Sequence, residues 1–136
     1  MRRVITFGTF DVFHIGHVNI LERACELGEK LIVGISSDAL NFSKKGRYPI
    51  FSEEQRIRMV AAIHCVDETF IEESLELKKH YLQKYNVDIL VMGDDWSGKF
   101  DHDREICEVT YLPRTKDIST TEIIETIRKL DWSPKK

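Results

Sequence analysis

Short apolar runs, nearly free of polar residues, are the feature that most restricts what this chain can fold into. They cover residues 4–7, 31–35, 88–92 and 109–112, with a weaker one at 68–71. Strands buried on both faces have such sequences, whereas strands with one solvent-exposed face alternate between apolar and polar residues. Amphipathic segments of helical length separate the runs. We therefore expect a doubly wound, Rossmann-like α/β fold with a parallel five-stranded sheet.

Apolar spacing and capping signals predict helices over residues 17–27, 52–63, 75–85 and 119–130. Two of these begin with a capping box, in which a hydroxyl residue precedes Gln or Glu by three positions: Ser52 with Gln55, and Ser119 with Glu122. No repeat or Pro/Gly/Ser-rich linker interrupts the pattern. We therefore treat residues 1–136 as one domain, a length typical of a single domain.

The composition excludes several classes of function. Hydrophobic residues make up 42% of the chain, and the net charge of −3 provides no basic field for a nucleic acid. No segment approaches the ~20 apolar residues of a membrane span, and the apolar run near the first residue is too short for a signal peptide. Cys25, Cys65 and Cys107 are widely spaced and odd in number, which predicts neither disulfides nor a zinc site. We expect a cytoplasmic protein without a nucleic-acid or membrane partner.

Chemistry-bearing residues follow the first strand, where a doubly wound fold binds its ligand. The segment from Gly8 to His17 places His14 and His17 three residues apart, the second at the start of a helix, with Gly16 between them. Gly16 leaves room for a phosphate against the helix N-terminus, whose free N–H groups favour anions. Two imidazoles add side-chain donors. A capping pair or half of a metal site is the alternative interpretation.

A basic segment follows the second strand. Lys44, Lys45 and Arg47 surround Gly46, and we expect a mobile loop that is either a phosphate clamp or a solvated surface. Arg56 lies one turn after the capping box at Ser52 and either points into the same cleft or faces solvent. Either interpretation is consistent with the sequence.

Two further segments follow later strands. Asp94 and Asp95 could bind a hydroxyl, a base amino group or a metal, or could cap a turn. Arg114 and Thr115 precede a helix whose first residues are the hydroxylic Ser119, Thr120 and Thr121. Such a helix start, with a guanidinium beside it, suits a phosphate.

Two anion-binding helix starts, a basic segment and a histidine pair on one rim indicate a ligand with several phosphoryl groups. The chain contains neither a GxxxxGK[ST] loop nor a GxGxxG motif. It is therefore neither a Walker-type NTPase nor a typical dinucleotide-binding protein.

These motifs resemble those of a known family. His14-Ile15-Gly16-His17 is similar to the signature of a nucleotidyltransferase superfamily. The runs Gly8-Thr9-Phe10-Asp11, Gly93-Asp94-Asp95-Trp96 and Arg114-Thr115-x-x-Ile118-Ser119-Thr120-Thr121 resemble those of its cytidylyltransferases, above all the branch that acts on glycerol 3-phosphate. The resemblance covers nearly the whole chain and implies the fold predicted above.

The resemblance also implies a reaction and roles for residues. CMP would pass from CTP to a phosphorylated alcohol, in the first place glycerol 3-phosphate, and pyrophosphate would leave. His14, His17, Lys44 and Arg114 would be catalytic, and Lys44, Arg56 and Lys78 would bind the acceptor. The implied contacts to CTP come from Thr9, Phe10, His14, Ile15, Gly16, His17, Arg47, Asp95, Arg114, Thr115, Ile118, Ser119, Thr120 and Thr121, with Lys45 as a rival to Arg47. Mg²⁺ would bridge the phosphates, with Asp11 as its candidate protein ligand.

Some points stay open. Another acceptor (phosphocholine, phosphoethanolamine or a tetritol phosphate), an adenylyltransferase that uses ATP, and a non-catalytic nucleotide sensor are the alternatives. The resemblance implies an arginine near the active site where this chain has His64. It also implies a homodimer, and a product that feeds an envelope or capsule polymer.

Overall fold

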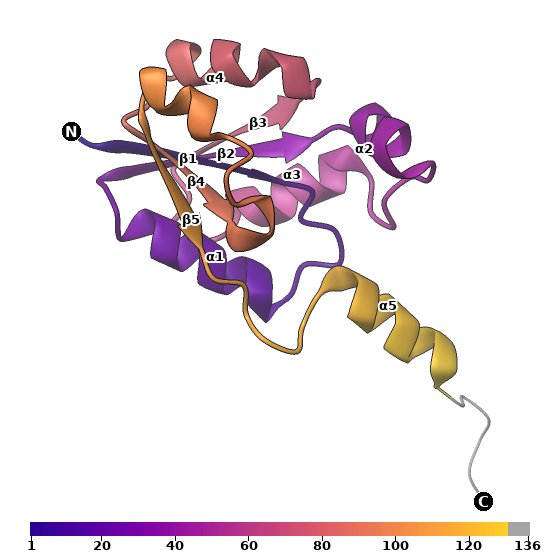
Figure 1. Ribbon diagram of the computed structural model, residues 1–136. Coiled ribbons are helices and arrows are strands. Elements are labelled where there is room, and N and C mark those ends of the chain that lie inside the picture. The colour runs from indigo at the N-terminus through magenta and orange to yellow at the C-terminus, as the bar shows by residue number, and fades with distance from the viewer. Residues whose placement is uncertain (131–136) are drawn as a thin grey trace, which may run out of the picture.

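The computed structural model describes residues 1–130, and their centre is a five-stranded parallel sheet (Figure 1). The strands are β1 (Arg3–Gly8), β2 (Lys30–Ser36), β3 (Glu68–Glu72), β4 (Ile89–Gly93) and β5 (Glu108–Leu112), in the order β3-β2-β1-β4-β5. Every neighbouring pair is parallel. The predicted doubly wound α/β fold is confirmed, and all five predicted strands are present.

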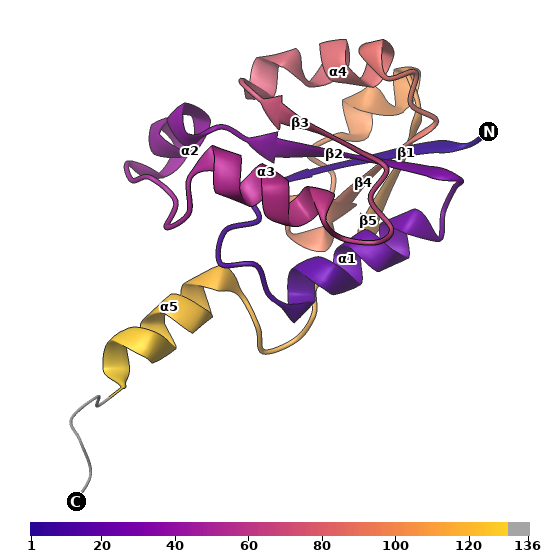
Figure 2. The same ribbon diagram turned by 180° about the vertical axis from the view of Figure 1, so that it is seen from behind.

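Helices cover both faces of this sheet. The α-helices are α1 (Ile15–Cys25), α2 (Asp38–Lys45), α3 (Glu53–Ala61), α4 (Lys78–Lys84) and α5 (Thr120–Lys129), and short 3₁₀ turns lie at η1 (Leu75–Leu77), η2 (Asp94–Trp96) and η3 (Asp101–Glu105). Figures 1 and 2 show α1 and α3 on one side of the sheet and α4 on the other. None of the described helices is long and apolar enough to cross a membrane.

The continuous apolar strands are explained by two separate cores, one on each face. Along β1, Ile5 and Phe7 belong to the core beneath α4, whereas Val4 joins the core beneath α1 and α3. Successive side chains of a strand point to opposite faces. Both faces are therefore apolar here, and alternation disappears from the sequence.

The segment after β2 differs from the prediction. Helix α2 was not predicted, and it includes Lys44 and Lys45, which were expected in a mobile basic loop. The Ser37 hydroxyl caps it by accepting a hydrogen bond from the Leu40 amide at 3.0 Å. The helix ends at Gly46, which adopts a left-handed conformation with φ of 72° and donates its amide to the Phe42 carbonyl. Lys44 and Lys45 lie in the last turn of α2, where the helix dipole stabilises positive charge.

Strand order reverses beside β1, because the chain first adds β2 and β3 on one side and then β4 and β5 on the other. A doubly wound sheet opens a crevice at that point, outside the carboxyl ends of its strands. The segments leaving β1, β2, β4 and β5 meet there. Helix α5 follows the last of them and extends away from the sheet in both views (Figures 1 and 2).

Candidate active site

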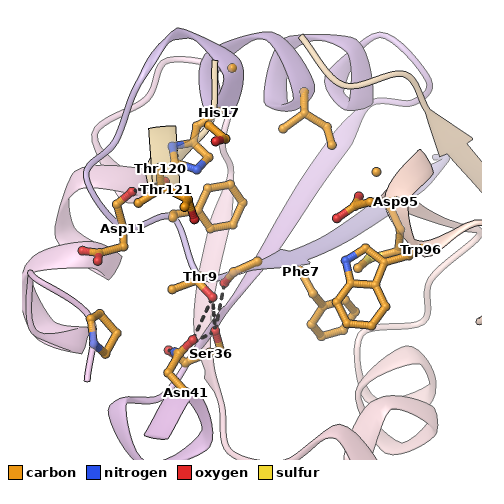
Figure 3. Close-up of a pocket in the computed structure, with 18 of the residues that line it drawn as sticks. Phe7, Thr9, Asp11, His17, Ser36, Asn41, Asp95, Trp96, Thr120 and Thr121 are labelled. Atoms are coloured by element: carbon orange, nitrogen blue, oxygen red, sulfur yellow. Dashed lines mark hydrogen bonds between the residues drawn. The ribbon is translucent and has the colours of Figure 1, made fainter. Parts of the chain in front are cut away.

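A cavity of about 500 Å³ lies at the carboxyl ends of the strands (Figure 3). Most of the predicted site residues line it: Thr9, Phe10, Asp11, His14, Gly16, His17, Lys44, Lys45, Arg47, Lys78, Asp95, Arg114, Thr115, Ile118, Ser119, Thr120 and Thr121. Five segments far apart in the sequence thus contribute to one hollow. Its size suits a ligand as large as a nucleotide.

The two histidines form the start of α1. The Nδ1 atom of His14 accepts a hydrogen bond from the Gly16 amide at 3.0 Å, and the Nδ1 atom of His17 accepts one from the His14 amide at 3.1 Å. This is a reciprocal capping box built from imidazoles. Because each Nδ1 is an acceptor, each neutral ring carries its proton on Nε2 and keeps that N–H as a donor.

Both imidazoles are held in the neutral state. Burial, with the charge of His14 as a smaller cause, lowers the pKa of His17 to about 3. Burial and the nearby Arg114 guanidinium lower the pKa of His14. The pair therefore offers hydrogen-bond donors without the charge of an imidazolium.

The loop between β1 and α1 is conformationally strained. Phe10 and Val12 have φ angles of 54° and 48°. This left-handed region costs a β-branched residue such as Val12 about 1–3 kcal/mol. The Asp11 carboxylate braces the loop, because it accepts hydrogen bonds from the amides of Ile50 and Phe51 at 2.7 and 2.9 Å.

The chain between β5 and α5 forms the opposite wall. The Thr120 hydroxyl donates to the Asp11 carbonyl at 2.8 Å, and Asn19 Nδ2 donates to the Thr115 hydroxyl at 2.9 Å. Figure 3 shows His17, Thr120 and Thr121 near one another, so the two helix starts border the same space. Ser119 caps α5 by accepting from the Glu122 amide, but the reciprocal contact of a full capping box is not among the described contacts.

Sequence reasoning missed a buried polar cluster on the cavity floor. The Thr9 hydroxyl donates to Asn41 Oδ1 at 2.9 Å, and Asn41 Nδ2 donates to the Ser36 hydroxyl at 3.1 Å (Figure 3). Ser36 and Asn41 are each 1% exposed. The only available signal was the position of Ser36 at the end of a strand, because Asn41 lies in the unpredicted helix α2.

The expectation that Arg56 points into the cleft and binds the acceptor is wrong, because Arg56 does not line the cavity. Its side chain is fully buried, and its guanidinium donates to three carbonyls and one carboxylate. The acceptors are the carbonyls of Thr9, Ser36 and Phe51 and the carboxylate of Asp38. With its donors directed to these groups, Arg56 stabilises the cavity wall from behind.

Two other expectations also change. Ile15 is 55% exposed and lies outside the cavity, since it is at the outer side of α1. His64 is exposed in the turn between α3 and β3, which places it at the amino ends of the strands, opposite the cavity. Asp11 has both carboxylate oxygens engaged by backbone amides, and among residues 1–130 no cluster of His, Cys, Asp or Glu could hold a metal ion.

At the far end of the cavity, Lys78 of α4 and Glu72 of β3 form a buried ion pair, with Nζ 2.7 Å from Oε2. Phe7 and Trp96 line this end, and Figure 3 shows them across the cavity from Asp11 and Thr120. Glu72, Phe7 and Trp96 were not predicted as site residues. Each lies at or just beyond the carboxyl end of a strand, which is the signal that could have found them.

A Rossmann-like sheet with a histidine-capped helix start facing a second helix start defines a nucleotidyltransferase-type site. The chain belongs to the cytidylyltransferase-like family, whose model matches residues 5–126. It is 48% identical over 130 residues to the glycerol-3-phosphate cytidylyltransferase of Bacillus subtilis, covering 96% of this chain and all of that protein. It is 45% identical to the enzyme of the same name from Staphylococcus aureus, covering 90% and 92% of the two chains.

A solved structure supports the fold independently. The lipopolysaccharide core biosynthesis protein from Thermoplasma volcanium superimposes with a TM-score of 0.76 at 23% identity, over 85% of this chain and 99% of that one. The likeness concerns the arrangement of strands and helices.

Proposed function

We propose that this protein transfers CMP from CTP to glycerol 3-phosphate, forming CDP-glycerol and pyrophosphate. The observation that carries the proposal is the stacked His14–His17 pair, whose Nε2 donors border the same cavity as Arg114 and the start of α5. The near full-length similarity to two glycerol-3-phosphate cytidylyltransferases supports the choice of nucleotide and acceptor.

The chemistry needs little from the protein beyond positioning and charge stabilisation. The second pKa of a phosphate monoester is ~6, so the acceptor is largely a dianion at pH 7 and is itself the nucleophile. One of its oxygens bonds to the α-phosphorus of CTP while the bond to the β-phosphate oxygen breaks, and pyrophosphate leaves with that electron pair. No proton has to be removed from the nucleophile, which agrees with a site whose imidazoles are hydrogen-bond donors.

Each wall then has a role. His14 and His17 donate from Nε2 to the α-phosphate, where negative charge develops as the two oxygens exchange. Arg114 and the hydroxyls at the start of α5 hold the β- and γ-phosphates and release them as pyrophosphate. Lys44 stands at the cavity edge for the acceptor phosphate, and desolvation there lowers its pKa, an effect that Glu72 opposes.

We propose that Mg²⁺ enters with CTP, bound to its phosphate oxygens, because the described residues build no multidentate metal site. This is the alternative to Asp11 as a protein ligand of the metal. Magnesium commonly keeps several waters and few protein ligands when it accompanies a nucleotide. Its contribution is to neutralise charge on the phosphates.

The direct test is pyrophosphate release from CTP with glycerol 3-phosphate and Mg²⁺, with the product identified by mass. We expect turnover with CTP to exceed turnover with ATP by a factor of at least ten. A preference for ATP would support the adenylyltransferase alternative. No pyrophosphate with any phosphorylated alcohol would favour a nucleotide sensor.

We further propose that the protein acts in the cytoplasm as a homodimer and that its product feeds an envelope or capsule polymer. The three cysteines are free thiols, as a reducing compartment requires. Light scattering during size-exclusion chromatography measures the oligomeric state, and a monomer mass at micromolar concentration would contradict the dimer.

A further inference from the structure

Glu72 and Lys78 form an ion pair that is both buried and part of the cavity lining. Glu72 is 2% exposed and Lys78 is 5% exposed, and Lys78 Nζ donates to Glu72 Oε2 at 2.7 Å. Burying two charges is costly. A pair placed in a substrate cavity therefore suggests a role in recognition rather than in stability alone.

The Lys78 ammonium also occupies an aromatic recess. Its Nζ lies 3.6 Å from the centre of the Phe7 ring and 5.2 Å from that of Phe100. Trp96 packs against Phe100 with ring centres 5.6 Å apart. Such rings are what proteins use to bind quaternary ammonium groups, but here a resident cation already covers two of their faces.

Glu72 keeps one acceptor for a ligand. Only its Oε2 atom is engaged by a described side chain, and Oε1 accepts no hydrogen bond from residues 1–130. Oε1 is also not among the fully buried atoms that lack a partner, so it is not sealed from solvent, and Glu72 lines the cavity. A ligand hydroxyl can donate to this oxygen.

Other charged side chains lie near the pair. Lys44 of α2 is close enough to Glu72 for their charges to interact, and the buried Asp103 of η3 interacts in the same way with Lys78. Asp103 does not line the cavity, whereas Lys44 does. Asp95, the neighbour of Trp96, also lines the cavity. A ligand at this end therefore meets the ammonium groups of Lys44 and Lys78 and the carboxylates of Glu72 and Asp95.

We propose, as a refinement that rests on the proposed function, that the Glu72–Lys78 pair makes this site specific for an uncharged polyol phosphate and rejects cationic amino-alcohol phosphates. A polyol hydroxyl donates to Glu72 Oε1 while the phosphate dianion lies near Lys44 and Lys78. A choline or ethanolamine group in the same position would face Lys78 and find the rings of Phe7 and Phe100 covered. Glu72 and Lys78 are thus specificity-determining residues.

The test compares kcat/KM for glycerol 3-phosphate, phosphoethanolamine and phosphocholine at saturating CTP. The variants are Glu72→Gln, Lys78→Met and the double variant Glu72→Gln/Lys78→Met, which leaves no charge at either position of the pair. Lys79→Met is the matched control, because Lys79 is the exposed neighbour on the same helix. The KM for CTP and the urea midpoint report on the remainder of the site and on folding.

We expect the native protein to prefer glycerol 3-phosphate over phosphocholine at least 100-fold. In the double variant this ratio should fall at least tenfold, with the KM for CTP within twofold of native and with Lys79→Met unchanged. An unchanged ratio in a folded double variant would overturn the inference. If the double variant does not fold, Glu72→Gln decides, because Gln keeps the size of the side chain and an acceptor for Lys78; an unchanged ratio there overturns the inference equally.

The two proposals fail differently. If the native protein transfers CMP to none of the three acceptors, the proposed function is wrong. If it uses glycerol 3-phosphate but the variants at Glu72 and Lys78 leave the ratio of kcat/KM for glycerol 3-phosphate to that for phosphocholine unchanged, the function stands and the specificity assignment is wrong.

Discussion

The imidazole rings of His14 and His17 are stacked, with ring centres 3.8 Å apart and an angle of 29° between their planes. The backbone fixes this relationship, because the amides of Gly16 and His14 each donate to one Nδ1. Two Nε2–H donors are therefore fixed in position before any substrate arrives. Preorganised donors of this kind stabilise developing charge without reorganisation.

Replacing His17 by alanine should reduce turnover while the protein stays folded. Losing one transition-state donor costs roughly 10²–10³ in kcat, and we expect that loss in pyrophosphate release at saturating substrates. His80→Ala is the control, because His80 is exposed on α4 outside the cavity. A His17→Ala variant with native kcat would remove the pair from the mechanism.

A methyl group at Gly16 should disturb catalysis through the neighbouring ring. A Cβ atom at this position would lie 2.8 Å from His14 Cε1, closer than side chains approach one another, so the ring must shift. A misplacement of about 1 Å can cost on the order of 10²-fold in rate, and we expect Gly16→Ala to lower kcat by at least tenfold. In a His14→Ala background the same substitution should change kcat less than twofold, because the displaced ring is gone. Equal effects in both backgrounds would contradict this explanation.

Acid should destabilise the fold through His17. Its pKa is lowered to about 3 in the folded protein, whereas an unfolded histidine titrates near 6.5. Between these values the unfolded chain binds a proton that the folded chain does not, so stability present above pH 6.5 is lost as the pH falls towards 3. The slope is at most about 1.4 kcal/mol per pH unit for one group.

Urea unfolding at pH 7, 6, 5 and 4 measures this dependence. In His17→Asn the free energy of unfolding should fall less steeply with decreasing pH than in the native protein. The exposed His80→Ala control should keep the native slope. Parallel slopes for His17→Asn and the native chain would show that His17 titrates normally.

The sequence predicted the frame of this fold well because its strands are buried on both faces. Continuous apolar runs mark such strands without reference to tertiary contacts, and the segments that follow β1 and β5 carry both histidines and Arg114. Helix α2 was missed because its eight residues carry three polar and two basic side chains and read as a loop. Arg56 was misplaced because its acceptors, the carbonyls of Thr9 and Ser36, come together only in three dimensions.

Removing the Arg56 guanidinium should destabilise the whole domain. The fully buried side chain satisfies three carbonyls and the Asp38 carboxylate. Removing one partner of a buried ion pair typically costs about 3–5 kcal/mol. We expect a loss of that size in the urea unfolding of Arg56→Met, against about 0.5 kcal/mol or less for Arg58→Met, whose side chain is exposed on the same helix. Equal losses of unfolding free energy in Arg56→Met and Arg58→Met would show that the buried guanidinium contributes no more to stability than an exposed one.

Substituting Asp11 by asparagine separates a structural role from metal binding. The amide has a single acceptor oxygen for the Ile50 and Phe51 amides, so we expect a lower urea midpoint. The Mg²⁺ concentration for half-maximal pyrophosphate release should stay within twofold of native, because no metal contact is removed. A tenfold rise in that concentration would make Asp11 a metal ligand after all.

The amino and carboxyl ends of the parallel strands lie on opposite sides of the molecule, and the two sides tolerate added chain differently. Strand β1 starts at Arg3, so the N-terminus emerges at the edge opposite the cavity, where Arg3 bonds with Asp88 and Tyr85 rather than with site residues. Helix α5 instead begins with Thr120 in the cavity wall. Purification tags, surface immobilisation and fusion partners therefore belong at the first residue. A group attached beyond α5 would disturb the active site, because the first residue of that helix forms part of the cavity wall.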